Sequence, residues 1–376
     1  MISQRPVSAI KKLSPEDLRG FVDDGDLVQR IISLLYTDLS FSDIFIHEDS
    51  PMMIKRPLGL FAVSDHPVLD DEIHELFNKL EPNWKETIKA RAFDRSINLD
   101  KARIRANCFH FNNRSRKGVI IRRFPTVPLP LANLGLSIHA ESFAQLDRGL
   151  VLVIGDTGQG KSTTLASLLD KINMDRSGHI LTIEDPIETE IPVRGCLITQ
   201  REVGVNGDCA SFYVGAMDAL REKADVVMIG EIRDEDTARE AVALAESGPL
   251  VFASLHAKSP EQGLAKMVRL LGGSTPQAEA LSQALKGVVY QALLPSTSGL
   301  AYRLAAETIT MNPTFARAIA NQEFGKIRGL IESSPGCNTM NSILHRLIAE
   351  GEIHQKDAAV ASTDREKFNL EIRGRS

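Results

Sequence analysis

The sequence has few cysteines and no long apolar run. Its four cysteines, Cys108, Cys196, Cys209 and Cys337, are widely separated and lack the close pairs that a structural zinc site or a redox dithiol requires. We therefore expect four free thiols in a reducing cytoplasm. No stretch of about 18 uncharged apolar residues occurs, which argues against a membrane-spanning helix. Met1–Leu13 carries basic residues but no continuous apolar core, so no export signal is expected.

An excess of positive charge is also absent. The formal net charge of −5 gives no general attraction to nucleic acid. A local basic cluster is formed by Arg114, Arg116, Lys117, Arg122 and Arg123. It fits phosphate chemistry or a solvated edge as well as a DNA surface. With 43% hydrophobic and 25% charged residues, the composition is that of a soluble globular protein. Its 376 residues suffice for two or three domains.

The first part of the chain predicts a small α/β domain over residues 1–124. Apolar residues recur at helical spacing between Asp26 and Tyr36, and Asp26 is available as the N-cap. The helix face consists of Leu27, Ile31, Leu34 and Leu35. Strands are expected at Ser42–Ile46, Met52–Lys55, Ala102–Ala106 and Gly118–Ile121. Three prolines within Pro125–Pro130 are too stiff for a helix, so residues 125–131 are predicted to be a linker.

Residues 132–376 predict a second, larger domain. Short apolar runs, of the kind that form buried parallel strands, alternate in it with helix-like segments. These runs are Leu150–Ile154, Ile180–Ile183, Val226–Ile229 and Leu250–Ser254. After Ser298 the pattern is largely helical, with an apolar face before a Gly351 stop. That face consists of Ile343, Leu344, Leu347 and Ile348. We expect a doubly wound α/β core with a helical C-terminal part.

The stretch Gly155–Ser162 reads Gly-Asp-Thr-Gly-Gln-Gly-Lys-Ser and follows an apolar strand. This spacing of glycines, lysine and serine predicts a phosphate-binding loop that opens a helix. Lys161 would contact the β- and γ-phosphates, and the hydroxyl of Ser162 would face Mg²⁺. The remaining candidate nucleotide-binding residues of this stretch are Gly155, Thr157, Gly158, Gln159, Gly160 and Thr163. Bound ATP with Mg²⁺ is therefore expected.

Acidic residues follow two of the predicted strands, where ligands bind in such sheets. Glu184, Asp185 and Glu188 follow Ile183, and Gly230-Glu231 follows Ile229. Glu231 fits a Walker B position. Spacing alone does not separate a general base from a metal partner between Glu184 and Glu188, and a solvated turn is the alternative for both.

His256 also follows an apolar strand. A lone histidine is more often a packed or surface residue than a functional one. At this edge of the sheet a neutral imidazole could hydrogen-bond a γ-phosphate or a catalytic carboxylate.

These four segments resemble the type II/type IV secretion ATPase superfamily, in its PilT-like branch. Gly155–Ser162 matches the family's Walker A, Thr182–Glu188 its Asp box, Gly230-Glu231 its Walker B and Ser254–His256 its His box. The likeness covers about Ser42 to Ile353, including Leu197–Val203. Lys258 in the His box and the residues Phe315–Ala320 differ from the pilus retraction pattern. These differences favour the DotB-like and TraJ-like ATPases of type IV secretion and conjugation.

The resemblance implies a RecA-like P-loop core, a PAS-like N-terminal domain and a homohexameric ring with nucleotide between neighbouring subunits. It implies Glu188 as general base, Glu231 as partner of Mg²⁺ or water, and His256 as phosphate sensor, with Lys161 on the phosphates; Ser162 and Glu231 would hold the metal. Basic candidates for stabilising the γ-phosphate are Arg103, Arg105, Arg122, Arg201 and Arg221.

The expected function is an ATP hydrolase that powers a type IV secretion or conjugative transfer apparatus. The alternative is a type IV pilus retraction ATPase. A nucleotide-dependent assembly module is a third reading and a DNA translocase a fourth, although the chain lacks the interleaved aromatic and basic residues of a strand channel. The expected partners are further copies of the chain and cytoplasmic-membrane secretion or pilus machinery, without direct nucleic acid. We expect a cytoplasmic protein bound peripherally to the inner membrane.

Overall fold

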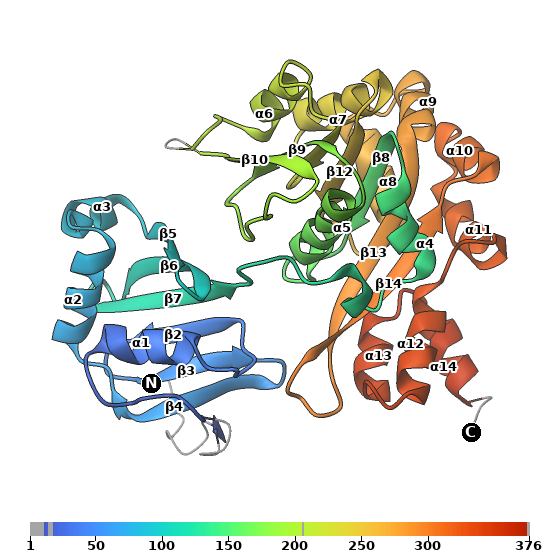
Figure 1. The fold of residues 1–376 in the computed structure, drawn as a ribbon. Helices are drawn as coiled ribbons and strands as arrows, with labels where there is room; N and C mark the ends of the chain where they lie inside the picture. The colour runs from blue at the N-terminus through green and yellow to red at the C-terminus, as the bar shows by residue number, and fades with distance from the viewer. Residues whose placement is uncertain (1–10, 14–17, 205–206, 374–376) are drawn as a thin grey trace. The chain divides into compact units, whose positions relative to one another are not determined.

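The computed structural model describes residues 11–13, 18–204 and 207–373. It divides into two compact units (Figure 1). Unit 1 comprises residues 1–126 with 298–301, and unit 2 comprises 127–297 with 302–376. The division therefore falls between Thr126 and Val127, inside the proline-rich stretch. Residues 1–10, on which most of the expectation about an export signal rests, lie outside the described residues.

Unit 1 is a mixed α/β unit built on one seven-stranded sheet with the order β1-β4-β3-β2-β7-β6-β5. Its strands are β1 (Lys11–Lys12), β2 (Asp43–His47), β3 (Pro51–Arg56), β4 (Gly59–Pro67), β5 (Phe93–Leu99), β6 (Ala102–Phe111) and β7 (Arg116–Phe124). Its helices are α1 (Leu27–Leu35), α2 (Asp70–Leu80) and α3 (Trp84–Ala90).

The core of unit 1 follows from the two periodicities of its sequence. Along β6 alternate residues are buried, as expected for a sheet with one covered face. The predicted helix is confirmed: Asp26 is the N-cap of α1 and accepts a hydrogen bond from the Gln29 N–H at 2.8 Å. The predicted apolar face is buried and packs with Ile44 and Ile104. Tertiary packing of this face stabilises the nine-residue helix, which is too short to be stable alone.

Unit 2 holds a second seven-stranded sheet, with the order β10-β9-β11-β12-β8-β13-β14. Its strands are β8 (Gly149–Ile154), β9 (Gly178–Glu184), β10 (Cys196–Glu202), β11 (Val226–Ile229), β12 (Leu250–Leu255), β13 (Leu285–Pro295) and β14 (Tyr302–Thr310). Its helices are α4 (Ile138–Glu141), α5 (Lys161–Asp175), α6 (Phe212–Ala219), α7 (Glu235–Ser247), α8 (Pro260–Leu270), α9 (Thr275–Ala284), α10 (Pro313–Ala320), α11 (Ile327–Ser333), α12 (Met340–Ala349), α13 (Gln355–Ala361) and α14 (Arg365–Arg373). Short 3₁₀ helices are η2 (Leu131–Asn133), η3 (Ser142–Gln145) and η4 (Phe324–Lys326).

Both faces of this sheet are covered, so β8, β11 and β12 are buried along their whole length. Val151 and Val153 of β8 pack with Leu165 of α5 on one face. Leu152 and Ile154 pack on the other face with residues of α7 and α8. The predicted α/β class, with buried parallel strands at the four apolar runs, is confirmed.

The expectation of a largely helical pattern after Ser298 is wrong for β14. Residues 302–310 form an edge strand antiparallel to β13. The charged residues Arg303 and Glu307 interrupt its apolar pattern, yet Glu307 is fully buried because it pairs with a cation described below. The helices α10 to α14 follow, and the red α12, α13 and α14 lie together at the end of the chain (Figure 1). In α12, Leu344 and Leu347 are buried as the pattern predicts.

Two expectations from composition bear on the described residues. All four cysteines are free thiols. Among the residues described, no helix combines the length and the apolarity needed to span a bilayer.

Candidate phosphate site

The loop between β8 and α5 is held open by glycines and tied to β13. Gly158 and Gly160 have φ of 75° and 80°, a region that L side chains rarely adopt. A Cβ on Gly155 would lie 2.7 Å from the backbone oxygen of Gln291. The loop backbone thus approaches β13 closely, and a glycine-rich loop at the N-terminus of a helix such as α5 is suited to bind an anion.

Gln159 fixes the loop against β13 by two hydrogen bonds. Its side-chain oxygen accepts from the Leu293 N–H at 2.6 Å, and its backbone oxygen accepts from the Gln291 amide at 2.7 Å. Two hydrogen bonds within the protein thus fix the position of Gln159 relative to β13.

Lys161 is the first residue of α5 and is buried, with 8% of its surface exposed. Its Nζ donates to the backbone oxygens of Gly155 and Asp156 at 3.0 and 2.9 Å. Burial lowers the pKa of the Lys161 ammonium, and the nearby carboxylates of Glu231, Asp156 and Glu188 oppose this shift. An ammonium in this environment is stabilised further by an anionic ligand.

His256 connects Lys161 to Glu231. The Nζ of Lys161 lies 3.3 Å from Nδ1 of His256, and Nε2 of His256 lies 3.2 Å from Oε1 of Glu231. Since an ammonium only donates, Nδ1 accepts, and a neutral imidazole then carries its proton on Nε2, facing Glu231. Arg233 extends this chain: its Nε lies 2.7 Å from Glu231 Oε2, and its guanidinium reaches Asp185 at 3.2 Å.

Glu184 at the end of β9 is a buried carboxyl group with local donors. Its Oε1 accepts from the Thr182 hydroxyl at 2.7 Å and from the Gln200 amide at 3.0 Å. Burial raises the pKa of Glu184, and these two donors oppose the shift. Glu188 is half-buried and close enough to influence the pKa of both Lys161 and Glu184. The carboxylates of both predicted acidic segments thus approach the loop lysine.

A cavity of about 510 Å³ lies beside the loop. It is lined by Asp156, His256, Ala257, Lys258, Gln262, Ala265, Lys266 and Arg269. Three of these side chains are cationic, so the cavity is suited to a polyanion. Within the described ranges, no group of three or more His, Cys, Asp or Glu residues could hold a metal by itself.

A family model described as type II/IV secretion system protein matches residues 98–373. The chain belongs to this family. Within it, the chain is 36% identical over 341 residues to the type IV pilus ATPase PilU of Pseudomonas aeruginosa, covering 88% of each chain. It is 32% identical over 338 residues to the type IV pilus retraction ATPase PilT of the same organism, covering 87% of this chain and 96% of PilT.

Solved structures of the family have the same fold. The pilus retraction motor PilT with bound ADP superposes with a TM-score of 0.79 at 30% identity, covering 92% of this chain and all of that one. The ATPase DotB of Legionella pneumophila gives the same TM-score at 21% identity, covering 94% and 97%. The membership in the PilT-like part of the type II/IV secretion family, expected from the motifs, is thus confirmed.

Two of the arginine candidates, Arg201 and Arg221, lie in unit 2, and both face acidic residues other than Glu188 and Glu231. Arg201 on β10 contacts Asp218 and Glu222 at 3.3 and 2.8 Å. Arg221 is exposed and lies 3.7 Å from Asp218.

The other three candidates lie in unit 1. Arg122 pairs with Asp43 at 2.9 Å and Arg105 with Asp94 at 3.0 Å, while Arg103 lies on β6. A role of any of these five residues at the phosphates stays a prediction.

Sequence reasoning assigned no role to several residues that shape the site of this family member. Gln200 and Thr182 hold Glu184, and Arg233 holds Glu231. The sequence could have indicated a role for Arg233, since it stands two residues after the predicted Walker B glutamate. The sequence could also have indicated Lys266 and Arg269, because residues three apart on the helix after His256 lie on the same helix face. No sequence pattern indicated the hydrogen bonds between Gln159 and β13, since the partners of Gln159 are more than 130 residues away.

Proposed function

We propose that the chain is an ATP hydrolase that powers a type IV pilus machine, as a motor of the retraction class. The observation that carries the proposal is the series of contacts from Lys161 through His256 to Glu231, next to the glycine-rich loop. The similarity to PilU and PilT over most of the chain supports the pilus part.

The loop residues would bind the triphosphate. Backbone N–H groups from Gly155 to Thr163 surround the β-phosphate, and Lys161 exchanges its backbone contacts for phosphate oxygens. Thr157, Gly158, Gln159 and Gly160 complete the loop. Ser162 is exposed at the first turn of α5 and would hold Mg²⁺ together with the phosphates and Glu231, since Mg²⁺ is commonly held by one or two protein groups plus phosphates. When bound, Mg²⁺ neutralises charge on the phosphates.

The carboxylates would orient and deprotonate water. Glu188 is the proposed general base. Glu231 accepts a hydrogen bond from Arg233 and lies 3.2 Å from Nε2 of His256, and both contacts hold it in place. His256 would report the γ-phosphate through Nδ1, because Lys161 leaves that atom when it turns to the phosphates. Glu184 would hold its neighbour Glu188 and nucleotide-bound water in position.

The arginine candidates, which are not part of the contacts between Lys161, His256 and Glu231, would act at the ring interface of a homohexamer. Arg122, Arg201 and Arg221, with Arg103 and Arg105, are the proposed candidates for stabilising charge on the γ-phosphate. We further propose that the ring works in the cytoplasm, on membrane-associated pilus machinery and without direct nucleic acid.

The pilus reading replaces the secretion reading as the leading proposal. The differences at Lys258 and Phe315–Ala320 favoured DotB-like motors, but the PilU and PilT relatives are 36% and 32% identical over nearly the whole chain. The likeness to DotB, at 21% identity, supports the fold alone.

Purified protein tests the enzymatic part. ATP turnover with Mg²⁺ is expected for the wild type, and both Lys161→Ala and Glu188→Gln are expected to lose it by about 10²-fold or more. Glu188→Gln should still bind ATP. Wild-type turnover in both variants would remove the proposal.

A deletion strain tests the biological part. Loss of pilus retraction with normal DNA and effector transfer is expected. Normal retraction with defective transfer would restore the secretion reading. Complementation with Glu188→Gln that restores retraction would instead favour an assembly module in which hydrolysis is incidental.

A further inference from the structure

Arg328 of α11 contacts two carboxylates from different parts of unit 2. Its Nη2 lies 2.8 Å from Oε1 of Glu261 on α8, and its Nη1 contacts Oε1 of Glu307 on β14. Glu307 is fully buried, and Arg328 itself is mostly buried. Burial raises the pKa of Glu307 to about 7, although the Arg328 guanidinium opposes this. Nη1 donates to Glu307 and Nη2 forms an ion pair with Glu261, so one planar guanidinium contacts both carboxylates.

Through Glu261, Arg328 is connected to the phosphate site by helix α8. Glu261 stands in the first turn of α8, five residues after His256. Lys266 of the same helix donates to the backbone oxygen of His256 at 3.1 Å. Gly263 brings α8 so close to β8 that an added Cβ would lie 2.4 Å from Ile154. Helix α8 is therefore in contact both with His256, through Lys266, and with β8, through Gly263.

Through Glu307, Arg328 is connected to the same loop by strands β14 and β13. Glu307 stands opposite Tyr290 in the β13–β14 register. The next residue of β13, Gln291, donates to the backbone of Gln159 in the loop. Arg328 thus contacts both α8, which follows His256, and β14, which pairs with the strand that holds the loop.

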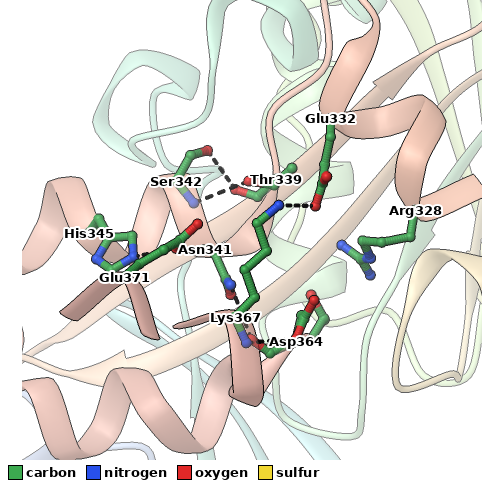
Figure 2. Close-up of a pocket in the computed structure, with 10 residues that line it drawn as sticks. Arg328, Glu332, Thr339, Asn341, Ser342, His345, Asp364, Lys367 and Glu371 are labelled. Atoms are coloured by element: carbon green, nitrogen blue, oxygen red, sulfur yellow. Dashed lines mark hydrogen bonds and ion pairs between the residues drawn. The ribbon is translucent and has the colours of Figure 1, made fainter. Parts of the chain in front are cut away.

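On its other side Arg328 lines a cavity of about 130 Å³ among the C-terminal helices (Figure 2). Two other side chains of this cavity find partners within the C-terminal helices: Lys367 pairs with Glu332 at 2.6 Å, and Nε2 of His345 lies 2.7 Å from Glu371. Arg328, by contrast, pairs with α8 and β14. Its two contacts join the helices that follow β14 to the part of the unit that holds the loop.

We propose that Arg328 is a positioning residue that couples nucleotide occupancy beside Lys161 to the arrangement of α11, α12, α13 and α14, through its contact with Glu261. The coupling rests on the proposed function, since the ligand it transmits is a nucleoside triphosphate. Glu261 is the contact that we expect to vary, because 19% of its side chain is exposed, whereas Glu307 is fully buried.

Hydrogen exchange of the full-length protein tests the coupling, with and without Mg²⁺ and a non-hydrolysable ATP analogue. In the wild type the analogue should slow exchange in residues 155–163 and change it in residues 327–373. Glu261→Gln should keep the effect in the loop and reduce the effect in the C-terminal helices by about threefold or more.

Two further variants make the test specific. Arg328→Lys keeps a positive charge beside Glu307 but lacks the planar guanidinium that contacts both carboxylates, so it should reduce the C-terminal response like Glu261→Gln. The double variant should be no worse than either single one, because both remove the same contact. Glu350→Gln, which removes the exposed partner of Arg346 on α12, should respond like the wild type.

A wild-type C-terminal response in Glu261→Gln and Arg328→Lys would overturn the coupling. So would loss of protection in the loop of Glu261→Gln, because Glu261 would then belong to the nucleotide site itself. A wild-type protein whose loop is protected but whose C-terminal helices do not respond overturns the coupling and leaves the proposed function standing. An unprotected wild-type loop overturns both.

Discussion

Lys161 and Arg328 are two cations of unit 2 that are largely shielded from solvent, and their surroundings differ. Lys161 contacts two backbone oxygens and an imidazole nitrogen. Arg328 contacts two carboxylates, one of them fully buried. Burying a charge is costly unless it is paired. The comparison teaches that Arg328 is neutralised by the protein itself, whereas full neutralisation of Lys161 awaits an anion from outside.

The difference also separates stability from binding. Removing one partner of a buried ion pair leaves the other uncompensated, so Arg328 matters for folding. Removing Lys161 takes away a buried charge that has no full partner in the protein. Lys161 is therefore expected to matter for ligand affinity and not for folding. The five predictions below test this contrast, from the largest expected effect to the smallest.

Arg328→Met should destabilise the protein most. It leaves the buried carboxylate of Glu307 without its cation, which costs about 3–5 kcal/mol of unfolding free energy. Urea unfolding at pH 8 measures the loss. The double variant Arg328→Met, Glu307→Met should recover most of it. An unchanged midpoint in Arg328→Met would show that the two buried cations do not differ in this way.

Lys161→Met should reverse the pattern. The affinity for ATP with Mg²⁺ is expected to fall by about 100-fold, close to 2.7 kcal/mol, while the unfolding free energy of the ligand-free protein changes by less than about 1 kcal/mol. Calorimetric titration and urea unfolding measure the two quantities. Lys171→Met, on the exposed side of the same helix, is the matched control and should bind ATP normally. Equal affinity in both variants would contradict the role of Lys161.

Glu307→Gln should remove a pH dependence of stability. The pKa of Glu307 is raised from 4.5 to about 7, so between these values the folded protein holds a proton that the unfolded chain has released. Wild-type stability therefore falls as pH rises from about 4.5 to about 7, by about 1–3 kcal/mol from this group. Unfolding of both proteins at pH 5, 6, 7 and 8 measures the difference. Parallel curves would count against a raised pKa.

Thr182→Val should have a moderate effect. It removes the hydroxyl that donates to Glu184 and leaves a carboxyl group with one donor fewer in a buried place. A loss of about 1 kcal/mol of unfolding free energy is expected, measured by thermal or urea unfolding. Val keeps the shape and β-propensity of Thr, so a loss well above this value would indicate a packing role instead.

Arg346→Ala should have the smallest effect. Its ion pair with Glu350 is exposed and lies one helical turn apart, so less than about 0.5 kcal/mol of stability is expected to change. The same unfolding measurement applies. A loss as large as that of Arg328→Met would erase the distinction between paired charges inside the fold and those on its surface.

Local patterns predicted much of the fold and the centre of the site. The capped helix after Asp26, the four buried parallel strands and the loop before Lys161 all depend on residues close in sequence, so their spacing reveals them. The strand β14 was missed because Glu307 breaks its apolar pattern, and its partner Arg328 is 21 residues away. The ties of Gln159 to β13 and of Gln200 to Glu184 join distant segments, which no local pattern records.

One consequence of the anchoring of Gln159 concerns product release. A loop already fastened to its neighbouring strand loses little conformational freedom on capturing a substrate, and it grips the diphosphate left after cleavage by the same amide groups. Relaxing the loop therefore does little to free the spent nucleotide. For the proposed ATP hydrolase, discharge is expected to depend on the groups that surround the terminal phosphate, and we expect the exchange of ADP to be slower than bond cleavage.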